Sequence, residues 1–216
     1  MRIAPEGWPF IWIGVALTAA LAVVWRAWPG WSLALPCVAA LLTVWIVVFF
    51  RDPERRGPRG DQFVIAPADG RVISVAEVDE PMYLHLQRAT RVSIFMNVVN
   101  VHVNRFPVSG EVDIVHYNPG EFFAASLDKA SLVNEQASVG IRGPRGPLLV
   151  RQIAGLIARR IVTDVAPGDS AVQGERFGMI RFGSRVDIFF APAARVRVSV
   201  DQHVRAGQTI IAEYPS

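Results

Sequence analysis

A Gly-Ser dipeptide at positions 183 and 184 lies between two apolar segments and occurs nowhere else in the chain. The surrounding residues 176–190, RFGMIRFGSRVDIFF, predict two strands joined by a tight turn. Glycine leaves its carbonyl sterically open, and the Ser184 hydroxyl is within reach of it. An N→O acyl shift would give an ester, and elimination and hydrolysis would then leave a pyruvoyl group at residue 184. Taken alone, the pair also fits an ordinary turn.

Two other segments carry side chains that could assist this reaction. Asp69 lies in PADG, residues 67–70, where it could stabilise a turn or orient an imidazole. His102 lies in an alternating run that predicts Asn100, His102 and Asn104 on one face of a strand and valines on the other. Because histidine titrates near neutral pH, His102 suits proton transfer, although a histidine on a strand is also commonly structural.

Four separated segments resemble phosphatidylserine decarboxylases of the short bacterial type, in the family's order and from about residue 49 to the C-terminus. They are PADG at 67–70, NVHVNRFPVSG at 100–110, RQIAGLIARRI at 151–161 and the segment 176–190. The resemblance implies autocatalytic cleavage between Gly183 and Ser184, with Ser184 converted to the pyruvoyl cofactor. It also implies that Asp69 acts in self-processing and His102 in decarboxylation.

The resemblance further implies a substrate and a subunit composition. Phosphatidylserine would form a Schiff base with the pyruvoyl group, lose CO₂ and yield phosphatidylethanolamine. A large chain, 1–183, and a small chain, 184–216, would form a heterodimer or a higher oligomer. Residues 129–136, KASLVNEQ, resemble a family segment near the substrate site, so Lys129 and Asn134 are candidate substrate-binding residues, although a solvated loop there is an equal alternative. Asn100, in the histidine motif, is a further candidate.

This sequence departs from longer relatives of the family within the histidine motif. Those relatives have a second histidine at the position of Arg105 and an aspartate at the position of Asn100. His102 is therefore the only imidazole in the motif. The same histidine would then act in both self-cleavage and decarboxylation.

Composition argues against several other functions. The single cysteine, Cys37, excludes an intramolecular disulfide, and no histidine pair has metal-ligand spacing, so we expect no metal. The only lysine, Lys129, has no phosphate-binding glycine loop beside it, which disfavours pyridoxal phosphate. The net charge of +3 comes without any nucleic-acid-binding motif.

The N-terminal region predicts a membrane anchor over residues 1–50. Residues 8–25 and 31–50 contain no charge, and each run is close to the roughly 20 residues that cross a bilayer. A cleavable signal peptide is the alternative for the first run. Pro36 could kink the second helix, so a spanning hairpin and an embedded one both remain open. The arginines of a basic linker, 51–60, predict the cytoplasmic side of the inner membrane and contact with anionic lipid.

The remaining residues, 61–216, predict a catalytic domain that is mainly β (α+β) with barrel or lipoyl-like elements. Residues 156–162 could instead form a helix. Short apolar or alternating segments predict strands at 63–66, 71–78, 91–97, 111–117, 137–142, 148–164, 177–182, 185–190, 195–200 and 209–213.

Three other functions compete with a lipid decarboxylase. The first is a pyruvoyl-dependent decarboxylase of another amino acid, which the hydrophobic hairpin disfavours. The second is a non-enzymatic, membrane-anchored lipoyl-like adaptor in which the Gly-Ser pair is only a turn. A serine hydrolase is disfavoured because the chain has no G-x-S-x-G motif.

Overall fold

The computed structural model describes residues 2–30, 32–80, 83–84, 86–120, 134–155, 160–181 and 184–215. The chain divides into two compact units, Met1–Glu54 and Arg55–Ser216. The first unit is helical, and the described residues of the second unit form strands and turns. The predicted mainly β fold behind an N-terminal apolar hairpin is confirmed.

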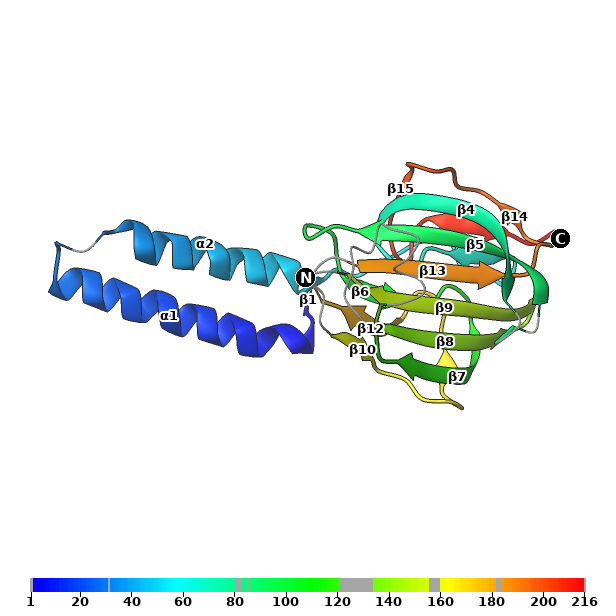
Figure 1. Cartoon of the computed structure of the whole chain (residues 1–216), viewed down its shortest axis with the longest axis horizontal. Coiled ribbons are helices and arrows are strands. Elements are labelled where there is room, and N and C mark those ends of the chain that lie inside the picture. The colour runs from blue at the N-terminus through cyan, green and yellow to red at the C-terminus, as the bar shows by residue number, and fades with distance from the viewer. Residues whose placement is uncertain are drawn as a thin grey trace. The chain divides into compact units, whose positions relative to one another are not determined.

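The first unit is an antiparallel pair of helices (Figure 1). β1 (Arg2–Ile3) and the 3₁₀ helix η1 (Pro5–Gly7) lead into α1 (Trp8–Ala27), and α2 (Ala34–Phe49) leads into β2 (Arg51–Asp52). The strands β1 and β2 pair with each other, so the two ends of the hairpin meet. The helices approach closely at Gly14, where an added Cβ would lie 2.6 Å from the Thr43 hydroxyl oxygen.

The two helices differ in length. The segment Pro5–Ala27 is long and apolar enough to cross a membrane, by length and composition. With 16 residues, α2 measures about 24 Å at 1.5 Å per residue, against a bilayer core of about 30 Å. Pro36 lies in the first turn of α2, where backbone N–H groups have no helical acceptor, so it does not interrupt the helix.

The second unit is built on a curled antiparallel sheet of eight strands, in which β13 lies between β9 and β5 (Figure 1). In spatial order the strands are β11 (Ser170–Ala171), β7 (Gly110–Asn118), β8 (Gln136–Gly143), β9 (Gly146–Ala154), β13 (Ser184–Phe190), β5 (Leu86–Met96), β4 (Gly70–Glu80) and β15 (His203–Val204). Two three-stranded sheets complete the unit. One contains β10 (Ile161–Thr163), β12 (Arg176–Ile180) and β6 (Val103–Arg105), and the other contains β14 (Arg195–Val196), β16 (Ile210–Glu213) and β3 (Phe63–Ile65).

The central strand β13 is buried along its whole length. Val186, Ile188 and Phe190 alternate along one face and join the main hydrophobic core, which also includes residues of β5, β9 and β12. On the opposite face, Phe189 packs in a smaller cluster with Leu149. Because both faces are covered, every side chain of β13, polar ones included, is removed from water.

The predicted strands are largely confirmed, with one important difference in connectivity. The run 148–164 was predicted as a single strand, but β9 ends at Ala154 and β10 begins at Ile161 in another sheet. Residues 156–159, which include most of the alternative helix, lie outside the described residues. Local alternation therefore located the strands but did not assign them to sheets.

Candidate active site

Ser184 begins β13 and is completely buried. Its register partners are Met96, the last residue of β5, and Ala154, the last residue of β9. The Ser184 hydroxyl donates a hydrogen bond to the Met96 sulfur over 3.3 Å. The serine is therefore held at the end of three adjacent strands in the middle of the main sheet.

The segment that precedes Ser184 crosses between two sheets. The strand β12 pairs with β10 and β6, whereas β13 pairs with β5 and β9, so β12 and β13 do not form a hairpin. The two strands predicted around Gly183 and Ser184 are confirmed, but they belong to different sheets. Gly183, the other half of the predicted cleavage site, lies outside the described residues.

His102 lies immediately before β6 and is fully buried. Its ring Nδ1 is 3.0 Å from the carbonyl oxygen of Asn100. Because a carbonyl can only accept, Nδ1 carries the proton in this hydrogen bond, and Nε2 is then the unprotonated nitrogen of the neutral ring. The His102 carbonyl accepts a hydrogen bond from the backbone of Ile180 over 3.3 Å, so the histidine is tied to the end of β12 that leads to Ser184.

The alternation predicted around His102 is only partly observed. His102 and Asn104 are both fully buried, but Asn100 is partly exposed in a turn, and Val101 and Val103 are buried as well. The strand β6 is short and covered on both faces, so burial does not separate polar residues from valines. The Asn100 side chain accepts a hydrogen bond from the backbone of Asn97 over 2.9 Å and stabilises this turn.

Asp69 is buried, but its carboxylate has partners other than an imidazole. One oxygen lies 2.7 Å from the guanidinium of Arg55, and the other accepts a hydrogen bond from the backbone N–H of Ala206 over 2.8 Å. Among the described residues, no contact joins Asp69 to His102. The next residue, Gly70, packs against the backbone of β5, since an added Cβ would lie 2.2 Å from the Phe95 carbonyl oxygen.

Of the candidate substrate-binding residues, Asn134 lies beside the serine's strand partner. Its side-chain N–H donates to the carbonyl oxygen of Ala154 over 2.6 Å, and the residue is 2% exposed. Ala154 is the residue opposite Ser184 on β9. Lys129 lies outside the described residues.

Sequence reasoning missed three side chains that form a polar cluster with Asn104 next to Ser184. Gln152 donates to the Asn104 side-chain oxygen over 2.8 Å and accepts from the hydroxyl of Thr163 over 3.1 Å. The Asn104 amide nitrogen faces the sulfur of Met96 over 3.9 Å. The sequence feature that could have revealed this cluster is Gln152, a polar residue in the mostly apolar segment LLVRQIA.

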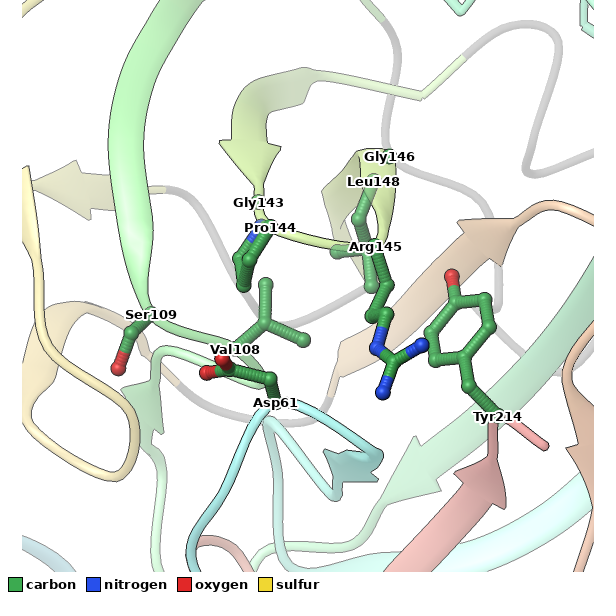
Figure 2. A pocket seen from close by; sticks show the side chains of 9 residues that line it. All are labelled: Asp61, Val108, Ser109, Gly143, Pro144, Arg145, Gly146, Leu148 and Tyr214. Atoms are coloured by element: carbon green, nitrogen blue, oxygen red, sulfur yellow. The ribbon is translucent and has the colours of Figure 1, made fainter. Parts of the chain in front are cut away.

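A shallow pocket lies at the opposite end of the same strands (Figure 2). Asp61, Arg145, Leu148 and Tyr214 are among the residues that line it, and burial raises the pKa of the Tyr214 hydroxyl above its usual value. Leu148 pairs with Phe190, six residues along β9 from the pair of Ala154 and Ser184, or roughly 20 Å at 3.3 Å per residue. The pocket is therefore separate from the serine site.

The family model described as phosphatidylserine decarboxylase matches residues 42–212, which include nearly the whole second unit and every predicted site residue. No group of three His, Cys, Asp or Glu residues that could hold a metal is found in the part of the chain that the structure describes. The buried serine, the buried histidine and the asparagine cluster all lie within the matched segment.

Proposed function

Because this chain belongs to the phosphatidylserine decarboxylase family and is thus a carboxy-lyase, we propose that it cleaves itself between Gly183 and Ser184 and acts through a pyruvoyl group formed from Ser184. The observation that carries the proposal is the position of Ser184, buried at the first residue of a central strand. A pyruvoyl group supplies the carbonyl that accepts the electrons left when CO₂ departs. The substrate is phosphatidylserine and the product phosphatidylethanolamine, in phospholipid biosynthesis.

The surroundings of Ser184 fit such a group. The side chain of residue 184 rests against the Met96 thioether, a weak hydrogen-bond acceptor that is otherwise apolar. That surface accommodates the hydroxyl of the serine and would equally accommodate a methyl group in its place. Loss of the hydroxyl therefore leaves no strong side-chain hydrogen-bonding partner buried without its bond.

The small chain 184–216 has the contacts needed to stay bound after cleavage. All seven residues of β13 pair with β5 on one side and with β9 on the other. Two further strands of the small chain pair with the large chain, β15 with β4 and β16 with β3. We infer that the two products of cleavage remain a heterodimer, alone or within a higher oligomer.

His102 is the residue that we propose for proton transfer. With Nδ1 bonded to Asn100, the Nε2 atom can take a proton from the Ser184 hydroxyl during cleavage and return a proton to the substrate carbon after CO₂ leaves. Asn134, Asn100 and Lys129 remain predicted substrate-binding residues, and the part in self-processing that the family resemblance implies for Asp69 is disfavoured by its pairing with Arg55. Of these, Asp69 and Asn134 have buried structural partners in the described residues.

The proposal is tested by the intact mass of the purified protein together with decarboxylation of phosphatidylserine in vesicles. The wild-type protein should separate under denaturing conditions into two chains, with a 33-residue fragment that begins with the altered residue 184. The variant Ser184→Ala should remain whole and inactive. An active wild-type enzyme that consists of one unbroken chain with an intact serine would overturn the proposal.

A further inference from the structure

We propose that Asn104 supplies the side-chain N–H that stabilises the oxyanion formed during self-cleavage, and that Gln152 and Thr163 fix the direction of its amide. The inference rests on the proposed self-cleavage and names a residue for the oxyanion donor that this reaction needs. It starts from an unusual feature of the core. Asn104, Gln152 and Ser184 are all completely buried at the junction of the two sheets.

The direction of each amide in this cluster follows from the sulfur of Met96. A thioether has no hydrogen to donate, so only the NH₂ side of Asn104 can favourably face it. The Asn104 oxygen then faces Gln152, whose NH₂ side must be the donor, over 2.8 Å. This leaves the Gln152 oxygen to accept from the hydroxyl of Thr163.

The amide of Asn104 is therefore held with its donor side toward the serine. One hydrogen of the NH₂ group faces the sulfur, and the second has no protein acceptor among the described residues. A buried N–H without an acceptor costs about 1–3 kcal/mol, so its presence beside a reactive serine calls for a partner that appears only during the reaction.

The acyl shift creates such a partner. The Ser184 oxygen bonds to the carbonyl carbon of residue 183 and passes its proton to a base, while the π electrons of the carbonyl move onto its oxygen. Collapse breaks the C–N bond, the nitrogen takes up a proton, and an ester remains. In the intermediate the negatively charged oxygen is two bonds from the serine oxygen, so its location depends on Ser184.

The distances are compatible with Asn104 reaching that oxygen. The Asn104 nitrogen and the Ser184 oxygen contact the same sulfur over 3.9 and 3.3 Å, so they are at most 7.2 Å apart. An oxygen two bonds from the serine oxygen can lie between them. Hydrogen bonds to reacting groups are often long before the intermediate forms and shorten with it.

Two substitutions that preserve side-chain shape test the role of Asn104. Asn104→Asp replaces the donor with an oxygen. Gln152→Glu keeps Asn104 but presents it with an acceptor, which should turn the amide so that its oxygen faces the serine. Each variant should cleave about 100-fold or more slowly, the usual loss for one oxyanion donor, when the appearance of the small chain is followed from fresh full-length protein.

The matched control is Gln173→Glu. Gln173 is a buried amide outside the cluster, and it donates to the carbonyls of Phe63 and Pro107. This variant should cleave at the wild-type rate even if its melting temperature falls as far as that of Gln152→Glu. If Asn104→Asp does not fold, the cleavage rate of Gln152→Glu alone is compared with that of Gln173→Glu.

A chemical probe separates ester formation from later steps. Neutral hydroxylamine cleaves esters and leaves amides, so it should release no fragment from Asn104→Asp if the missing donor prevents the ester from forming. Folded variants that cleave at the wild-type rate, or rapid release of the fragment by hydroxylamine, would overturn the role of Asn104 alone. A wild-type protein that never cleaves would instead overturn the proposed function.

Discussion

At the scale of single residues, the structure distinguishes the two polar residues that the sequence placed beside the serine. His102 is fully buried, and its Nδ1 is hydrogen-bonded to the backbone carbonyl of Asn100. Asp69 has both carboxylate oxygens engaged, by Arg55 and by the backbone of Ala206. We therefore expect the histidine to transfer protons, as proposed, and the contacts of the aspartate favour a role in fixing a turn.

This difference predicts opposite results for two substitutions. His102→Ala should abolish cleavage or slow it by about 100-fold or more, because it removes the base that takes the serine proton. Asp69→Asn should lower the free energy of unfolding by about 3 kcal/mol, because Arg55 loses a largely buried partner, and its folded fraction should still cleave. Fragment formation and urea unfolding measure the two effects.

The same experiment can contradict the assignment. If Asp69→Asn folds normally but stays whole, Asp69 takes part in the relay that the family resemblance implied. If His102→Ala cleaves and decarboxylates at wild-type rates, the histidine has no part in either reaction.

At the scale of the strand, β13 contains a buried ion pair directly after the serine. The guanidinium of Arg185 contacts both carboxylate oxygens of Asp187, over 2.6 and 2.8 Å, and donates to the hydroxyl of Ser93 on β5 over 3.0 Å. All three residues are at most 1% exposed. A shift of β13 by one residue would place these charged side chains on the face that packs in the main hydrophobic core. The cluster therefore holds β13 in the register that places Ser184 against Met96.

Asp187→Asn should therefore lower the free energy of unfolding by about 3–5 kcal/mol, since the buried arginine would lose its counter-ion. Asp201→Asn is the control, because its pair with Arg71 is exposed and should contribute about 1 kcal/mol or less. Both are best measured by urea unfolding in the Ser184→Ala background, where the chain stays whole. Equal losses in the two variants would contradict a special contribution from the buried pair.

Sequence reasoning succeeded where the signal was local and failed where it was not. The apolar or alternating segments 137–142 and 185–190 predicted β8 and β13, because each pattern depends on neighbouring residues. The crossover before Ser184 depends on which sheet each strand joins, and no local pattern encodes that choice. The cluster of Met96, Gln152 and Thr163 likewise unites three strands that are distant in sequence.

At the scale of the whole molecule, the two units divide the work of the enzyme. The strand-rich unit contains all the described residues of the serine site. The helical unit exposes most of its apolar side chains, including Leu17 at 54% and Leu41 at 69%, near the middle of α1 and α2. Such helices are typical of segments surrounded by lipid. We infer that the helical unit keeps the enzyme at the membrane that contains its substrate.

This division predicts that membrane binding and self-cleavage can be separated. The double variant Leu17→Asp and Leu41→Asp should move the protein from the membrane to the soluble fraction, because a carboxylate at the centre of an apolar helix costs about 2.5–3.5 kcal/mol on insertion. Cleavage should proceed normally, since the serine site lies in the other unit. Decarboxylation of vesicle phosphatidylserine should fall by about tenfold or more, while that of a short-chain, water-soluble analogue should be unchanged.

The matched control is Val200→Asp, which places the same charge at an exposed valine of the catalytic unit. It should change neither the membrane fraction nor the activity on vesicles. If the double variant stays in the membrane fraction, the helices do not anchor the enzyme. If it leaves the membrane but decarboxylates vesicle lipid at the wild-type rate, the catalytic unit reaches its substrate without them, and the lipid specificity must then reside in the strands around Ser184.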